Sequence, residues 1–227
     1  MNGKLLDFGL PLLVLLLGTM ILAVTGADLA LSTWFYRPEG WPVGNQFPWR
    51  QFYRWGYYPA ELIGLISLGL LSASFFKPTL LRFRRQAAYM VVLLLVGPGL
   101  LVNALFKDHW GRPRPRQIVP FGGAMQFHQP WERGEAGKGK SFPSGHGGSA
   151  FYLAMPFFLL RRRKPHLAAR VYAGGILYGV LMGVARISQG GHFASDILWS
   201  WGIVHLTAVA CYYLMRPDQV DSPPLAD

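Results

Sequence analysis

Residues 187–199 read ISQGGHFASDILW, and this stretch places an ionisable pair at the start of an apolar segment. His192 and Asp196 lie four residues apart, so a helix would bring their side chains to one face. The segment that follows, 195–215, is apolar and about as long as the roughly 20 residues that a helix needs to cross a bilayer. Ionisable groups are disfavoured in a membrane and usually mark function there. The stretch therefore predicts a membrane helix with a functional site at its entrance.

Other apolar segments of similar character precede this one. The six candidate spans are 5–26, 58–76, 87–106, 146–160, 169–184 and 195–215. The composition agrees, because 52% of the 227 residues are hydrophobic and only 15% are charged, which is little charge for a soluble domain. We expect an all-α bundle of six transmembrane helices that forms a single domain over residues 1–227. The first segment is long for a signal peptide, which favours an uncleaved span.

Two short connections, 77–86 and 161–166, are basic and free of acids, as is typical of cytoplasmic loops. A count of Lys and Arg alone does not decide the orientation, because the opposite loops hold as many over longer stretches. With six spans, both termini would be cytoplasmic and the longest loop, 107–145, would face outward. We expect a bacterial inner-membrane protein whose site faces the periplasm. An aromatic and basic segment, 47–58, is expected among the lipid headgroups.

The net charge of +11 does not indicate a nucleic-acid binder, because the basic residues lie between long apolar runs and form no continuous face. An anionic lipid or anionic substrate is the favoured partner. The single cysteine, Cys211, has no second thiol to pair with. A disulfide framework and a thiolate metal site are therefore both excluded.

Three stretches of the outward side are rich in polar residues: 107–115 (KDHWGRPRP), 141–146 (SFPSGH) and 185–196 (ARISQGGHFASD). Each adjoins the end of a predicted helix, so the three can meet at the membrane surface. The candidate site residues in these stretches are four cations, two histidines and a carboxylate. These residues are Lys107, Arg112, Arg114, Arg186, His146, His192 and Asp196. Arginine and lysine are the usual ligands of phosphate, so the set predicts a phosphate site.

The same residues can perform phosphoryl transfer. If Asp196 accepts the Nδ1 proton of His192, then Nε2 is free to attack phosphorus. His146 can protonate the departing oxygen and later activate water. Ser144 and Gly145 open a helix whose N-terminal N–H groups favour an anion, although a serine there can also be a simple cap. A metal site is disfavoured, because the crowded cations would repel a divalent ion.

The spacing of these residues resembles the three-part signature of the type 2 phosphatidic acid phosphatase (PAP2) superfamily. The matching residues are Lys107 with Arg114-Pro115, then Pro143-Ser144-Gly145-His146, then Arg186, His192 and Asp196. Ala185 departs from it, where serine is common. The longer pattern at 110–117, followed by FGG at 121–123, is similar to that of some bacterial lipid A phosphatases.

The resemblance implies that His192 is the nucleophile, Asp196 its orienting partner and His146 the general acid. It also implies that the phosphate is held without a metal or other cofactor by Lys107, Arg114, Ser144, Gly145 and Arg186. Two further cations, Arg112 and Arg116, would contact a second phosphate or a neighbouring headgroup.

The activity that follows is hydrolysis of a phosphate monoester or diphosphate on an amphiphilic lipid. Lipid A, undecaprenyl diphosphate, phosphatidylglycerophosphate and phosphatidic acid all qualify. Three alternatives stay open, namely a lipid-to-lipid phosphotransferase, a non-catalytic carrier of phosphorylated lipids and a vanadate-dependent peroxidase. The sequence does not indicate the oligomeric state.

Overall fold

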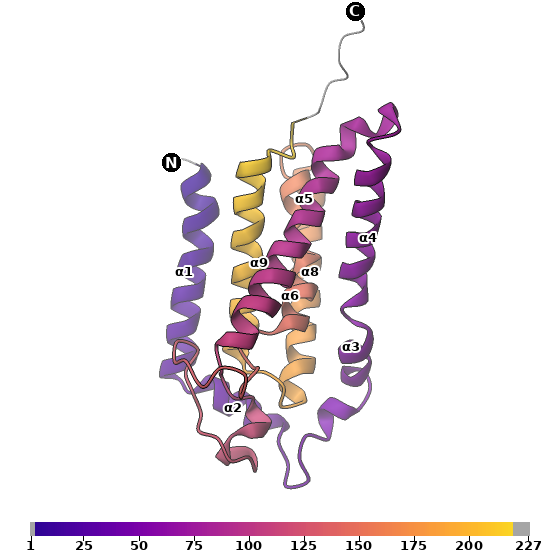
Figure 1. Cartoon of the computed structure of the whole chain (residues 1–227). Coiled ribbons are helices and arrows are strands. Elements are labelled where there is room, and N and C mark those ends of the chain that lie inside the picture. The colour runs from indigo at the N-terminus through magenta and orange to yellow at the C-terminus, as the bar shows by residue number, and fades with distance from the viewer. Residues whose placement is uncertain (1–2, 220–227) are drawn as a thin grey trace, which may run out of the picture.

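The computed structural model describes residues 3–219. Within that range the regular secondary structure is helical, apart from two isolated β-bridges. This confirms the all-α prediction. The long helices run side by side, and the shorter ones gather at one end of the bundle (Figure 1).

Among the described residues, four helical segments are long and apolar enough to cross a membrane. They are α1 (Gly3–Val24), the continuous segment Pro78–Lys107, α8 (Pro165–Ser188) and α9 (Ala194–Met215). The segment Pro78–Lys107 comprises the turns of η2 (Pro78–Phe83), α5 (Arg84–Leu94) and the wider π-helix η3 (Leu95–Lys107). Large apolar side chains such as Leu5, Leu16 and Leu95 are exposed on these helices, as expected where a helix faces lipid.

The two remaining predicted spans are helical but short. Helix α4 (Tyr58–Ala73) has 16 residues. The segment predicted at 146–160 is divided into α6 (Gly145–Tyr152) and α7 (Phe157–Leu160), with turns between them. At 1.5 Å rise per residue, a helix of this length falls short of the roughly 30 Å hydrocarbon core. The structure thus contains helices at all six predicted places, and four of them have the length of a span.

Helix α9 lies at the centre and packs against α1, α5, α6 and η3. Its buried face joins residues of α5 and α6, such as Tyr89, Leu93 and Tyr152, in the main hydrophobic core. The hydroxyl of Tyr152 donates to the backbone carbonyl of Met90 at 3.0 Å, which ties α6 to α5. The core therefore fixes the positions of the helices that carry the polar motifs.

The start of α1 and the end of α9 lie at one end of the bundle (Figure 1). The opposite end, which we call the site end, holds the segment 108–144 and three short helices. These are α2 (Ala27–Phe35), η1 (Val43–Asn45) and α3 (Trp49–Trp55). A second hydrophobic cluster built on Ile118, Phe121 and Phe193 packs the long segment against α2 and the start of α9. All three polar motifs meet at this end.

Candidate active site

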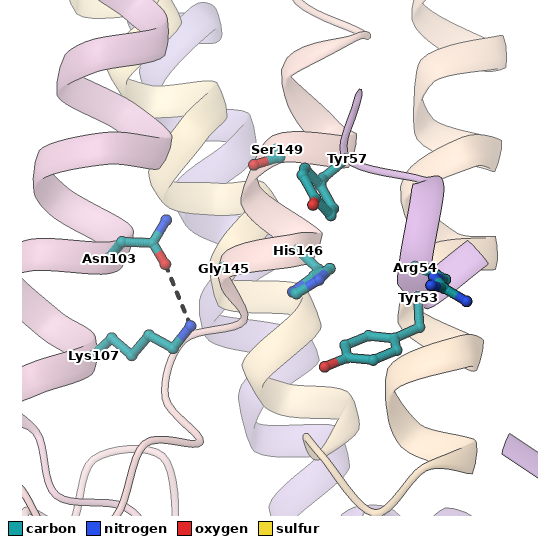
Figure 2. Close-up of a pocket in the computed structure, with 8 residues that line it drawn as sticks. All are labelled: Tyr53, Arg54, Tyr57, Asn103, Lys107, Gly145, His146 and Ser149. Carbon is teal, nitrogen blue, oxygen red and sulfur yellow. Dashed lines mark hydrogen bonds between the residues drawn. The ribbon is translucent and has the colours of Figure 1, made fainter. Parts of the chain in front are cut away.

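Two adjoining cavities open at the site end, with volumes of about 450 and 420 Å³. They share Tyr53, Lys107 and His146. Figure 2 shows His146 between Lys107 on one side and Tyr53 on the other. The second cavity is lined by Trp41, Asn45, Arg50, Tyr53, Lys107, Arg114, Arg116, His146, Arg186, Gln189 and His192. Among residues 3–219, its lining contains five cations, several neutral side chains and no carboxylate.

Lys107 is held at the end of η3 by its neighbour one turn earlier. Its Nζ donates to Asn103 Oδ1 at 3.3 Å, and Asn103 Nδ2 donates to the backbone carbonyl of Pro98 at 2.7 Å. A Cβ at Gly145 would lie 2.3 Å from Asn103 Oδ1 and 2.9 Å from Lys107 Nζ. Glycine at 145 therefore lets the ends of these two side chains lie against the start of α6 without being displaced.

His146 lies in the first turn of α6, and two tyrosines form its wall. The Tyr53 ring is 5.1 Å from the imidazole, and Tyr57 meets it edge-on at 5.4 Å. Ser144 caps α6, because its hydroxyl accepts from the Gly147 N–H at 3.2 Å. Ser144 is buried and lines neither cavity. The hydroxyl of Ser144 thus serves the helix start, while Gly145 and His146 face the cavity.

His192 is 1% exposed and lies just before α9. Its Nδ1 is 2.6 Å from the backbone carbonyl of Ser141, whereas Asp196 Oδ2 is 3.7 Å away, which is too long for a hydrogen bond. This corrects the expectation that Asp196 accepts the Nδ1 proton directly from one helical turn away. Within residues 3–219, Nε2 has no hydrogen-bond partner.

Burial lowers the pKa of His192 to about 4. The nearby carboxylate of Asp196 opposes this effect, and the cations Arg186 and Lys107 add to it. The imidazole is therefore neutral at physiological pH. Since Nδ1–H donates to Ser141, the lone pair is on Nε2, as a nucleophile requires.

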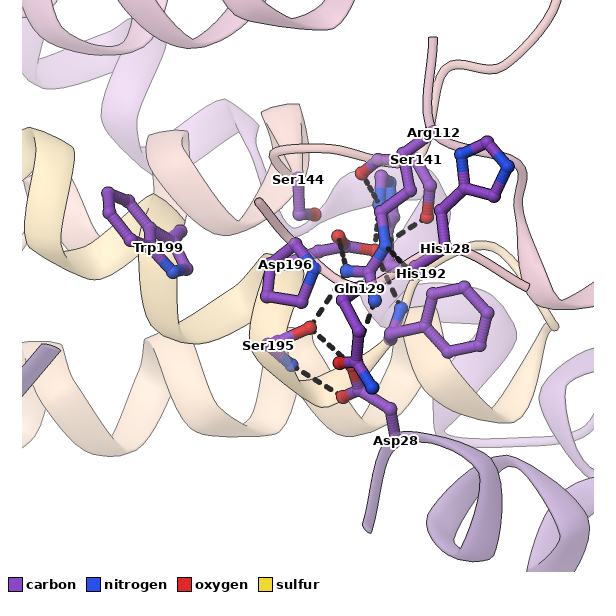
Figure 3. A network of polar contacts seen from close by, with 12 residues as sticks. Asp28, Arg112, His128, Gln129, Ser141, Ser144, His192, Ser195, Asp196 and Trp199 are labelled. Atoms are coloured by element: carbon purple, nitrogen blue, oxygen red, sulfur yellow. Dashed lines mark hydrogen bonds and ion pairs between the residues drawn. The ribbon is translucent and has the colours of Figure 1, made fainter. Parts of the chain in front are cut away.

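Asp196 acts through a buried network instead (Figure 3). Its Oδ2 accepts from the Ser141 hydroxyl at 2.5 Å and from the Phe193 N–H at 2.8 Å. Its Oδ1 accepts from Arg112 Nη1 at 2.5 Å. Asp196 thereby fixes Ser141, whose carbonyl in turn orients His192.

The prediction that Arg112 contacts a headgroup is wrong. Its side chain is fully buried, with an ion pair to Asp28 at 2.9 Å as well as the one to Asp196. It also lies over the Phe193 ring at 4.6 Å. Two carboxylates already hold the guanidinium, so it is not available to substrate.

The other cations of the motifs differ in this respect. Arg186 lies over the Tyr53 ring at 4.5 Å and donates to the side chain of Gln189. Its buried Nε has no hydrogen-bond partner among the described residues. Burial, and then the charge of Arg116, lowers the pKa of Arg114. Cations crowded in this way repel one another, so a bound anion would stabilise them.

The structure brings Lys107, Arg114, Arg116, His146, Arg186 and His192 to one cavity, and Gly145 to the other. Sequence reasoning missed Asp28, Tyr53, Asn103 and Ser141. The position of Asp28 just beyond the first apolar segment, on the side where the polar motifs were expected, was a usable signal. Residues 3–219 contain no group of three or more His, Cys, Asp or Glu side chains placed to hold a metal.

The sequence is similar to one protein family and to several lipid phosphatases. Residues 86–219 match the model of the PAP2 superfamily. The lipid A 4'-phosphatase of Francisella tularensis subsp. novicida is 32% identical over 83% of this chain and 86% of its own length. The lipid A 4'-phosphatase of Rhizobium leguminosarum is 40% identical over 48% and 46%. Phosphatidylglycerophosphatase B of Bacillus subtilis is 28% identical over 53% and 55%. No solved structure matches.

Proposed function

The chain belongs to the PAP2 superfamily, and from that premise we propose that it is a membrane lipid phosphatase whose nucleophile is His192. The observation that carries the proposal is the composition of the second cavity, which both histidines line. In the part of the chain that the structure describes, two histidines, one of them with a free Nε2, line it with Lys107, Arg114 and Arg186 and with no carboxylate. A carrier needs the cations but has no use for the oriented imidazole.

In the proposed reaction the three cations hold the phosphate, with the N-terminal N–H groups of α6 nearby. Nε2 of His192 attacks phosphorus as the bond to the lipid oxygen breaks, and His146, in the cationic form that the negative charge of the bound phosphate favours, gives its proton to that oxygen. His146 then takes a proton from water, which attacks the phosphohistidine. Inorganic phosphate leaves, and both imidazoles return to their starting states.

We further propose six membrane crossings within a single PAP2-type domain, with both termini in the cytoplasm and the site facing the periplasm of the inner membrane. Support comes from the common end at which α1 starts and α9 ends. The basic and acid-free segment 161–166 lies at that end, where Arg161 pairs with Asp7 of α1 at 2.7 Å. The short helices α4 and α6–α7 would cross with the help of polar flanks at the two surfaces.

For the substrate we propose a phosphate monoester of lipid A, as the name of the Francisella relative suggests. Arg50 and Arg116 are exposed and line the same cavity as the phosphate-binding cations. They are suited to a second anionic group of the substrate or to a neighbouring headgroup. Arg116, but not Arg112, keeps the role predicted from the sequence.

The test measures release of inorganic phosphate by the purified protein in detergent, without added metal. The panel is lipid A, undecaprenyl diphosphate, phosphatidylglycerophosphate, phosphatidic acid and a water-soluble phosphate ester. We expect lipid A to be turned over fastest and His192→Ala to release no phosphate while it still binds the lipid. Turnover of the soluble ester alone, or undiminished turnover by His192→Ala, would contradict the proposal.

A further inference from the structure

Asp28 is a buried carboxylate of α2 that lies outside the segment matched by the family model. It accepts from Arg112 Nη2 at 2.9 Å and from the Ser195 N–H at 2.8 Å, and the Ser195 hydroxyl also donates to it. Its exposed fraction is 3%. Figure 3 shows it below Ser195, on the far side of Arg112 from Ser141.

An unbroken series of contacts leads from Asp28 to the nucleophile. Arg112 joins Asp28 to Asp196. Asp196 accepts a hydrogen bond from the Ser141 hydroxyl, and the Ser141 carbonyl faces His192 Nδ1. The backbone reinforces this arrangement, because the Ser141 N–H donates to the Arg112 carbonyl at 3.0 Å.

The charges of this series matter for the reaction. Asp28, Arg112 and Asp196 together carry one net negative charge in a buried site, where charge interactions are stronger than in water. When Nε2 bonds to phosphorus, the imidazole becomes cationic, and that negative charge stabilises it. Without Asp28, the charge of Arg112 would cancel that of Asp196.

We propose that Asp28 is a positioning residue that neutralises Arg112 and so leaves the charge of Asp196 available to the phosphorylated His192. The inference rests on the proposed function, because it requires a cationic imidazole. Charged and titratable groups also face His192 from other elements. Lys107 of η3, His146 of α6 and Arg186 of α8 share its cavity, together with Arg114 and Arg116. All of them remain in the variants below.

The test is a charge cycle. Asp28→Asn brings the net charge of the series to zero, Arg112→Gln brings it to minus two, and the double variant restores minus one. Each variant is purified in detergent, and its kcat, its KM and the acid limb of its kcat/KM are measured. The same substrate is used throughout, so that the titration of the substrate phosphate is the same for every variant. Glu39→Gln, an exposed acid of the site end, is the matched control.

We expect Asp28→Asn to lower kcat about tenfold with little change in KM. The reason is that one charge, at the distance of Asp28 from His192, changes the stability of the cationic imidazole by the equivalent of about one pH unit at an effective dielectric of 20. Arg112→Gln should move the acid limb to higher pH by about one unit. The double variant should return both kcat and the acid limb toward the wild type, and Glu39→Gln should change neither.

A purely structural role predicts a different pattern, in which kcat falls together with thermal stability in the single variants while the acid limb stays at the wild-type pH. An acid limb common to all four proteins would therefore overturn the inference. If Asp28→Asn does not accumulate, Arg112→Gln and the double variant decide: an acid limb that rises in Arg112→Gln and returns in the double variant supports the inference, and any other pattern overturns it. Failure of the proposed function is recognised separately, because His192→Ala would then retain phosphate release.

Discussion

Arg112 and Arg186 are both buried arginines of the site end, and their surroundings are opposite. Arg112 lies between two carboxylates and donates to a serine and a backbone carbonyl as well. Arg186 has an aromatic ring and a glutamine as neighbours and a buried Nε without a partner. Arg112 belongs to the buried network on the Nδ1 side of His192. Arg186 belongs to the cluster of cations that lines the cavity beside the imidazole ring.

The difference separates two uses of the same side chain. A buried charge with its partners in place holds an arrangement together, and its removal lowers the folding stability strongly. A buried charge without a partner costs free energy in the empty protein, so it is retained where a ligand supplies the counter-charge. His192 lies at the boundary between the two regions, with Nδ1 toward the network and its ring in the wall of the cavity.

The largest effect is expected from Arg112→Ala. This change leaves Asp28 and Asp196 buried without their cation, and breaking a buried pair in this way costs about 3–5 kcal/mol. Thermal unfolding in detergent should show a much lower midpoint. An unchanged midpoint would mean that the network does not hold the site end together.

Arg186→Ala should lower the activity and leave the stability nearly unchanged. We expect kcat/KM to fall by about 10²- to 10³-fold, because a partly buried contact to the phosphate is lost, while the unfolding midpoint stays near that of the wild type. Arg133→Ala, an exposed arginine of the same end, is the control and should change kcat/KM less than about twofold. A large loss of stability in Arg186→Ala would remove the distinction between the two arginines.

The pH profile tests His192 itself. Its pKa is lowered from 6.5 to about 4, so the nucleophile is neutral above pH 4, and kcat/KM should fall tenfold per unit below it. Because the unfolded imidazole takes up its proton near pH 6.5, folding stability contributed by this group declines as the pH falls from there toward 4. Activity regained on return to pH 7 separates titration from unfolding. An acid limb near 6.5 that stays in place when substrates with different phosphate pKa values are compared would contradict the lowered pKa of His192.

The smallest effect concerns the wall between the cavities. The Tyr53 ring contacts both Arg186 and His146, and a cation–π contact of this kind is worth about 0.5–2 kcal/mol. Tyr53→Leu should therefore lower kcat/KM about threefold to tenfold, whereas Tyr53→Phe, which keeps the ring, should stay within about twofold. Equal losses in both variants would show that the hydroxyl matters and not the ring.

Local sequence predicted much of this arrangement. The apolar runs placed the helices, because length and hydropathy are properties of a single segment. The motifs placed Lys107, Arg114, His146, Arg186 and His192, because each adjoins the end of such a run. All five line one cavity.

Long-range contacts were not predictable in the same way. Asp28 and Arg112 are 84 residues apart, and Ser141 lies 51 residues before His192. No periodicity reports such pairs. The four-residue spacing of His192 and Asp196 suggested a direct bond, but α9 begins only at Ala194. The position of His192 outside the helix is what leaves room for Ser141 between them.

The central claim is that His192 is the nucleophile, and the most direct test is to trap its phosphorylated form. The enzyme is mixed with lipid A that carries radiolabelled phosphate, quenched within milliseconds in alkali, where phosphohistidine survives, and digested for peptide mapping. We expect label on the peptide that contains His192, at a level that declines as turnover ends, and no label in His192→Ala. Steady turnover with no labelled protein, or label on a different residue, would contradict the claim.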